Sequence, residues 1–497
     1  MVDVRNRLYR FQPKLGPEWG SGGIFGLKYH RDVLYFTLAF EAQAHFYYSE
    51  YNFEYEMKKL KIFPEHIHKI YNFDLIGKAP RSGGDTYNAV TAVDEKIYFG
   101  GWIHAPAIYE NKTLKFTQKF SHLHCYDIAD EKVKLLWKDG PGEEDGWAGE
   151  VSEVLYDELN NKLYIARGDG HFNLGLFVFD LDKNEMKMIS DEPALKGTQF
   201  FDKFVFNTGA LMFEGLQYVD IDTQEHNIIE VERDNKMAKD GEEVYEATLV
   251  DRIGCMGTTA NQLFVFLRGG FFKGNPFTEA ENSEPPMSFI RLFDFPRSST
   301  SPFRANVLPI RGGLLTAYNA LPDTFGMEKL KVFMPSVLVF ISPPMVKIVG
   351  VFGARITSIE KMGSSILVAG NTMPNTIQPI PMDSGHREIS VLSDDIIDRH
   401  PPAFEISVHG SIIEDKVWGG IPLTGYTQRR MIIHASKPNK IAIFEYTTEF
   451  PNYGEQLVTY ENIMQGKNVI DLDGYAGITS FKFENTDKRA KVSISLR

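Results

Sequence analysis

The stretch from Trp147 to Ile189 constrains the fold more than any other part of the sequence. It contains four short apolar segments separated by three clusters of Asp, Asn, Gly and Lys, which are residues that favour tight turns. A helix of this length requires apolar residues three and four apart, and a Gly-Asp-Gly break interrupts that spacing. The sequence therefore predicts the four antiparallel strands of one β-propeller blade: Glu150–Tyr156, Leu163–Arg167, Leu174–Leu181 and Met186–Ile189.

Similar openings recur along the chain, for example at Gly22–Phe46, Asn88–Pro106 and Ala354–Thr372. Each has an apolar strand, a tight polar turn and a second strand that ends in a glycine-rich or polar loop. Their spacing of roughly 50 to 65 residues exceeds that of compact blades and implies insertions. We predict an all-β fold, a β-propeller of about seven four-stranded blades within a range of five to eight. Residues 1–375 are expected to form its core, and residues 376–497 either complete the ring or form a small appended β-domain.

Composition narrows the possible partners and compartment. The 497 residues carry a formal net charge of −13, and no run of Lys or Arg stands out to neutralise phosphates, which disfavours nucleic acid as a partner. The two cysteines, Cys125 and Cys255, cannot form a disulfide framework. The N-terminus lacks an apolar core, and no window of about 18 residues is uninterrupted and apolar. We therefore expect a cytoplasmic protein that does not associate with a membrane.

Polar loops are expected to converge on one face of the propeller. Because neighbouring strands of a blade are antiparallel, the residues just before the first strand and just after the second meet on one side of the disc. In the first three repeats these loops are rich in carboxylates, imidazoles, amides and tryptophans, whereas the opposite loops are generic turns. The predicted ligand-binding residues are Glu41, Asn88, Trp102, His104, Trp147, His171 and Asn173, and the predicted catalytic residues are Glu150, Asp169 and Asp85.

These residue types suit a small polyhydroxylated ligand. Carboxylates accept hydrogen bonds from hydroxyl groups, and tryptophan rings pack against sugar rings. Paired carboxylates also serve as acid and base in glycoside cleavage, and we assign Glu150 and Asp169 to that pair. Glu153 lies three residues beyond Glu150. An odd separation on a strand points two side chains to opposite faces, so at most one of these two lines the channel, and Glu150 is preferred.

Each of these residues also has a structural interpretation. Asp169 can cap its own turn, and the histidines can be satisfied within the core. Trp102 and Trp147 can seal the gap between blades. Asp85 lies in a polar loop with few apolar neighbours, so a structural role explains it least well.

A divalent metal ion is an open alternative, and no cofactor is certain. Glu41, Asn88 and Asp169 offer the oxygen donors that calcium prefers, whereas His104 and His171 suit a transition metal. Two His-X-His pairs, His66 with His68 and His122 with His124, fall outside the predicted loops, and we interpret them as surface or outer-strand histidines. The motifs of serine hydrolases, P-loop proteins and dinucleotide-binding proteins are absent, which disfavours those chemistries.

Several motifs in the first part of the chain carry a resemblance: GPEWGSGGIFGLKYH, SGGDTYNAV, IYFGGWIHAPAIY, WAGEVSEVLYD and ARGDGHFNLG. Together they are similar to a family of uncharacterised archaeal proteins, a domain of unknown function found largely in thermophilic crenarchaea. The resemblance implies an archaeal, thermophilic source and says nothing about chemistry. Scarce Cys and Gln are compatible with a thermophile.

Two functions remain open on the sequence alone. The first is a propeller that binds a small polar ligand, such as a carbohydrate or a sugar lactone, at its loop-rich face. Whether the ligand is hydrolysed, by glycosidase-type or lactonase-type chemistry, stays open. The second is a non-catalytic scaffold that holds a protein partner on the same disc. A scaffold requires exposed apolar patches at the rim, and an enzyme requires convergent carboxylates in a pocket.

Overall fold

The computed structural model describes most of the chain in segments. These segments are residues 6–11, 23–39, 57–62, 68–73, 83–85, 88–104, 107–110, 113–116, 119–140, 149–168, 173–209, 213–231, 253–278, 286–295, 300–302, 305–319, 332–371, 387–448 and 457–497. Helix is limited there to the 3-10 turn η1 (Asp394–Ile397) and the single turn α2 (Gly410–Ile413). Both are far too short to cross a lipid bilayer, and the described segments contain no helix that is long and apolar enough to do so.

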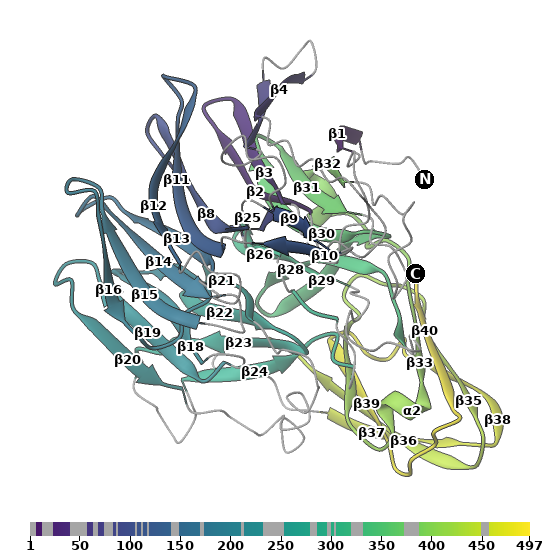
Figure 1. The fold of residues 1–497 in the computed structure, drawn as a ribbon. Helices are drawn as coiled ribbons and strands as arrows, with labels where there is room; N and C mark the ends of the chain where they lie inside the picture. The colour runs from purple at the N-terminus through teal and green to yellow at the C-terminus, as the bar shows by residue number, and fades with distance from the viewer. Residues whose placement is uncertain are drawn as a thin grey trace. The chain divides into compact units, whose positions relative to one another are not determined.

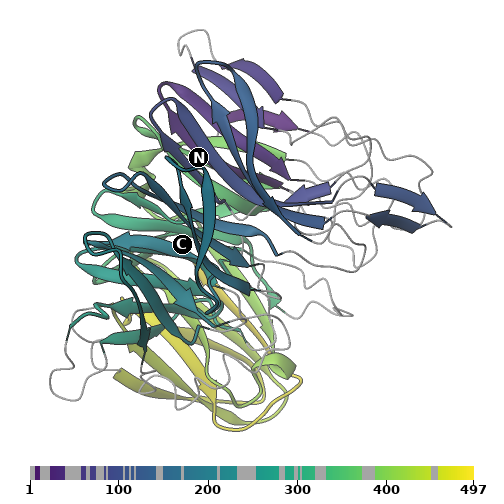
Figure 2. The same cartoon turned by 60° about the vertical axis from the view of Figure 1, so that its left-hand side comes forward.

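The predicted blade is present and its boundaries are nearly as expected. Its strands are β13 (Val151–Asp157), β14 (Lys162–Gly168), β15 (Asn173–Asp180) and β16 (Glu185–Ser190). They form a four-stranded antiparallel sheet in chain order, and the strands lie side by side in both views (Figure 1 and Figure 2). Asp157 and Asp180 accept backbone N–H bonds in the turns that follow their strands, which is why those Asp-rich clusters end them.

The chain divides into two compact units, and the first comprises Met1–Ile228 with Ile356–Ser393. It holds five blade-like sheets, numbered by chain order. The first contains β2 (Gly23–His30), β3 (Val33–Ala39), β4 (Met57–Ile62) and β5 (His68–Phe73). The second contains β6 (Gly83–Asp85), β7 (Val90–Val93), β8 (Lys96–His104), β11 (Lys119–Asp127) and β12 (Lys132–Asp139). The third is β13–β16. The fourth is β17 (Gly197–Phe200), β18 (Lys203–Thr208), β19 (Gly215–Asp220) and β20 (His226–Glu230). The seventh is β30 (Arg355–Met362), β31 (Ser365–Asn371), β32 (Arg387–Ser393) and β1 (Asn6–Phe11).

Two of these sheets depart from a simple repeat. The N-terminal strand β1 pairs with β32, so the first strand of the chain completes the seventh sheet and covers an edge that would otherwise be open. In the first sheet, β4 takes the outer edge before β5 returns to the third position, and β5 is therefore parallel to β3. A separate hairpin of β9 (Ala107–Glu110) and β10 (Thr113–Phe116) lies between β8 and β11 in the sequence.

The second unit comprises Ile229–Arg355 and Asp394–Arg497. Its fifth sheet is β21 (Ile253–Thr259), β22 (Gln262–Leu267), β23 (Gly270–Gly274) and β24 (Met287–Arg291). The sixth is β25 (Leu308–Ile310), β26 (Gly313–Tyr318), β28 (Ser336–Ser342) and β29 (Met345–Phe352). Two further sheets follow: β27 (Val332–Phe333), β33 (Phe404–His409), β40 (Lys491–Leu496), β35 (Arg429–Ala435) and β38 (Gly466–Asp471); and β34 (Trp418–Pro422), β39 (Ile478–Phe483), β36 (Asn439–Tyr446) and β37 (Leu457–Ile463).

The described residues thus contain many four-stranded antiparallel sheets, which confirms the predicted all-β propeller class. Residues beyond 375 divide between two roles, because β32 belongs to the seventh sheet and the remaining strands form the two C-terminal sheets. The boundary at residue 375 itself stays a prediction.

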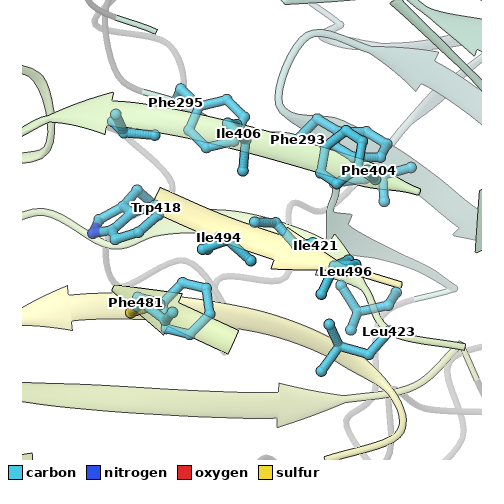
Figure 3. Close-up of a cluster of buried hydrophobic side chains, with 14 of the residues drawn as sticks. Phe293, Phe295, Phe404, Ile406, Trp418, Ile421, Leu423, Phe481, Ile494 and Leu496 are labelled. Carbon is cyan, nitrogen blue, oxygen red and sulfur yellow. The ribbon is translucent and has the colours of Figure 1, made fainter. Parts of the chain in front are cut away.

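Apolar packing joins neighbouring sheets. In the first unit, Leu123, Val151 and Ile165 belong to a buried cluster between the second and third sheets. In the second unit, a larger cluster extends from the fifth sheet into the C-terminal sheets, and Figure 3 shows Phe293, Phe295, Trp418 and Phe481 within it. Aromatic and β-branched residues favour strands for this reason, since alternate side chains can pack between two sheets.

Candidate functional site

A row of register partners crosses the second sheet at one level. Asp85 on β6 is paired with Trp102 on β8, Trp102 with Ser121 on β11, and Ser121 with Asp139 on β12. Cα partners on neighbouring antiparallel strands lie within about 6 Å of one another. The backbone therefore places two of the residues predicted from sequence, Asp85 and Trp102, in line with Ser121 and Asp139.

The third sheet meets this row through hydrogen bonds. The Ser121 hydroxyl donates to the carbonyl oxygen of Gly149 at 2.9 Å, and the N–H of Gly168 donates to the carbonyl of Glu150 at 2.8 Å. Arg167, paired with Val151 on β13, donates from Nη2 to Asp139 Oδ2 at 2.9 Å. These hydrogen bonds therefore connect the backbone around Glu150 to the row of residues that contains Asp85 and Trp102.

The two sheets approach so closely here because Gly100 has no side chain. A Cβ atom at Gly100 would lie 2.2 Å from Val151 Cγ1, which is well inside van der Waals contact. Gly100 is two residues before Trp102, and Val151 directly follows Glu150. This glycine in the GGW motif therefore serves close approach of strands rather than a positive-φ turn.

Arg167 is buried between aromatic rings. Its guanidinium carbon lies 4.7 Å from the ring centroids of both Trp137 and Phe177, and its side chain is only 3% exposed. Burial lowers the pKa of Arg167 and the neighbouring Asp139 carboxylate opposes that shift, so the side chain stays cationic. The rings and the ion pair hold the guanidinium in one orientation.

Glu150 is fully buried at the entry to β13, where the sequence predicts a catalytic carboxylate. The parity argument that separated it from Glu153 assumed a regular strand, and that premise fails because the register of β13 against β14 shifts between Val151 and Glu153; the preference for Glu150 stays a prediction. A bulge of this kind inserts a residue and resets which face each side chain takes. Glu153 contacts the start of the next sheet, where Lys196 Nζ lies 3.5 Å from Glu153 Oε2. Burial of Glu153 raises the pKa of its carboxyl group, and the positive charge of Lys196 opposes that shift.

Asn88 has a clear structural role. Its Oδ1 accepts the N–H of Gly26 at 2.7 Å, and its Nδ2 donates to the carbonyl of Thr357 at 2.9 Å. One side chain thereby links the second sheet to the first and seventh. The expectation that Asn88 binds a ligand or metal stays a prediction, and these contacts supply a structural reason for the residue.

The interpretation of His122 and His124 as surface or outer-strand histidines is wrong. Both lie on β11, inside the second sheet, and are 1% and 2% exposed. They share a face as the His-X-His spacing predicts, with their Nδ1 atoms 2.9 Å apart. Burial lowers the pKa of both imidazoles, that of His124 to about 3, so both rings are neutral at pH 7. His66 lies outside the described residues, and only the backbone of His68 is described, in β5.

The remaining predicted residues are described only in part. Glu41, Trp147, Asp169 and His171 lie outside the described residues. For Asp85, Trp102, His104 and Asn173 the backbone is described, with His104 paired to Gly83 and Asn173 to Gly168. Within the described segments, no group of three or more His, Cys, Asp or Glu has the arrangement of a metal site.

Sequence reasoning missed Ser121, Asp139 and the local role of Arg167. Arg167 directly precedes the Gly-Asp-Gly turn, and Asp139 follows Trp137 at the end of its strand. The available signal was an arginine at the end of one strand, Arg167, together with Trp137 and Asp139 at the end of the preceding blade. Only the register between the two sheets shows that these residues meet.

The fold and these contacts define a β-propeller protein with a polar junction between two of its blades. The chain belongs to the family described as "Uncharacterized protein conserved in archaea" (DUF2139), whose model matches residues 34–378, about two thirds of the sequence. This confirms the archaeal family expected from the N-terminal motifs. The comparison with curated proteins gave no match.

Solved structures show only distant similarity. A glycoside hydrolase family 43 arabinoxylan arabinofuranohydrolase from Bacillus subtilis matches with a TM-score of 0.30 at 10% identity, covering 82% of this chain and 94% of its own. The tricorn protease gives 0.31 at 12% identity, covering 68% and 38%. An oligogalacturonate lyase in complex with manganese gives 0.27 at 9% identity, covering 61% and 64%. Similarity at this level carries no functional argument, and the fold class rests on the sheets themselves.

Proposed function

We propose that this protein binds a small, neutral, polyhydroxylated ligand, such as a carbohydrate or a sugar lactone, at the junction of the second and third sheets. The observation that carries the proposal is the register row Asp85–Trp102–Ser121–Asp139, tied to the chain at Glu150 through Ser121 and Arg167. Carboxylates and a tryptophan in one row are the groups that recognise hydroxyls and sugar rings.

Hydrolysis is the reaction that this set of groups would support. Glu150 and Asp169 are the carboxylates assigned as acid and base, Asp85 is the third acidic group, and Glu150 is fully buried. A glycosidase uses two such carboxylates as acid and as base or nucleophile, whereas a lactonase uses a bound ion or base to activate water. Binding and turnover are therefore tested separately.

The scaffold alternative gains less support. The exposed large apolar residues on the outer strands of the second, third and fourth sheets are Leu135, Met188 and Ile228. Each lies on a different sheet, and single exposed apolar residues are normal for a protein surface. Within the described residues these three do not form a contiguous patch at this junction, whereas Val458, Tyr460, Met464 and Val469 are exposed on and between β37 and β38 of the C-terminal sheets.

The test is a panel of neutral oligosaccharides, glycosides and sugar lactones, screened for thermal stabilisation and for turnover. Wild type is compared with Asp85→Asn, Glu150→Gln and the control Glu158→Gln, which changes an exposed carboxylate at the opposite end of β13. We expect a binder whose affinity falls about tenfold or more in Asp85→Asn and is unchanged in the control. A wild type that binds no panel member contradicts the proposal.

A further inference from the structure

We propose that Asp139, held by Arg167, forms a hydroxyl-binding subsite at the opposite end of the row from Asp85. This inference rests on the proposed function and adds the residue that recognises one end of the ligand. Asp139 is the last residue of β12, and the sequence alone gave it no role.

One oxygen of the Asp139 carboxylate is bound by Arg167, and the other can accept hydrogen bonds from a ligand. Its Oδ2 accepts the hydrogen bond from Arg167 Nη2, and its side chain is 57% exposed. Within the described part of the chain, Oδ1 accepts no hydrogen bond. A carboxylate has about four acceptor positions, so Asp139 keeps capacity for ligand hydroxyls while Arg167 fixes its orientation.

Arg167 makes this orientation rigid. Ordinary surface ion pairs lose much of their value because both side chains must be ordered from solvent. Here the guanidinium is already buried and packed between Trp137 and Phe177, so only the Asp139 side chain has freedom to lose. A preorganised acceptor of this kind reduces the entropy cost of binding.

The charge of the pair selects the class of ligand. The positive charge of Arg167 balances the carboxylate of Asp139, so the subsite has no net charge to attract a free cation. An oriented acceptor oxygen instead favours a neutral O–H donor, and donation to a carboxylate is stronger than donation to a neutral acceptor. The subsite therefore fits a hydroxyl group of a neutral polyol.

The experiment measures affinity by calorimetry for the tightest neutral binder found in the panel. The proteins are wild type, Asp139→Asn, Arg167→Lys and the matched control Asp130→Asn. Asp130 has the same 57% side-chain exposure and lies in the turn at the other end of β12. We expect Asp139→Asn to weaken binding about tenfold or more, Arg167→Lys to weaken it by a smaller factor, and Asp130→Asn to stay within about twofold.

The outcomes separate this inference from the function on which it rests. Equal affinity in wild type and Asp139→Asn, with loss in Asp85→Asn, overturns the subsite and leaves the proposed function standing. A wild type without any neutral binder overturns both. If Arg167→Lys fails to fold, the exposed Asp139→Asn variant decides the question by itself, with its melting temperature measured alongside.

Discussion

Two junctions between sheets, one in each unit, are built on opposite principles. Between the second and third sheets, a buried arginine, a serine hydroxyl and an exposed carboxylate connect strand ends, and a glycine allows the backbones to approach. Between the fifth sheet and the C-terminal sheets, Phe293, Phe295, Trp418 and Phe481 fill the space (Figure 3). Polar groups oriented at strand ends are costly for stability and useful for recognition, whereas aromatic filling mainly stabilises.

The largest effect is expected at the aromatic junction. Trp418 is fully buried, with its ring 4.9 Å from Phe481 and 6.4 Å from Phe295. Trp418→Ala removes this packing and leaves a cavity, so the free energy of unfolding should fall by about 3–5 kcal/mol in denaturant titrations. The control Tyr460→Ala, at a side chain 62% exposed on β37, should change it by less than about 0.5 kcal/mol. Similar losses in the two variants would show that the aromatic cluster does not hold this junction.

A smaller effect is expected where the polar junction depends on a missing side chain. Gly100→Ala places a Cβ 2.2 Å from Val151 Cγ1, so the two sheets must separate or Val151 must move. Overpacking of this kind costs about 1–3 kcal/mol. Gly353→Ala is the control, because no atom of the described residues lies within 4 Å of the position that its Cβ would take. If Gly100→Ala also abolishes ligand binding while the protein remains folded, close approach of the two sheets is required for the site; unchanged stability would refute the contact.

The most gradual effect is the pH dependence from the histidine pair of the second sheet, because it is spread over several pH units. The pKa of His122 and His124 is lowered on folding, so the unfolded chain takes up protons below its ordinary pKa of about 6.5 while the folded protein does not. Stability is therefore complete above that pH and falls as pH decreases, by about 1.4 kcal/mol per pH unit for each histidine. For His124 this continues down to about pH 3.

The check is unfolding by urea between pH 7 and pH 4 in wild type and His124→Gln. The variant should show a shallower loss of stability with acidification, by about 1.4 kcal/mol per pH unit, because one proton-binding group is gone. Parallel curves for the two proteins would mean that His124 is protonated equally in the folded and unfolded chain.

The sequence was sufficient for the blade and insufficient for the junction. Turn chemistry and alternating apolar residues located β13 to β16 to within about a residue, because those signals are local. The bulge after Val151 is not visible in the sequence, and it removes the regular strand that the parity argument about Glu150 and Glu153 assumed. The burial of His122 and His124 depends on their position inside a sheet, which spacing alone does not give. The contact between Arg167 and Asp139 links residues 28 apart on different sheets, so only register and packing reveal it.

The central claim is that the junction of the second and third sheets is a ligand-binding site, and a crystal structure of the complex with the tightest neutral panel binder tests it most directly. The quantity to measure is the distance from Asp139 Oδ1 to the nearest ligand oxygen. The proposal predicts a hydrogen bond of about 2.5–3.0 Å, with the ligand extending along the row toward Trp102 and Asp85. A ligand bound on another surface, with the Asp139 carboxylate facing bulk solvent, would contradict it.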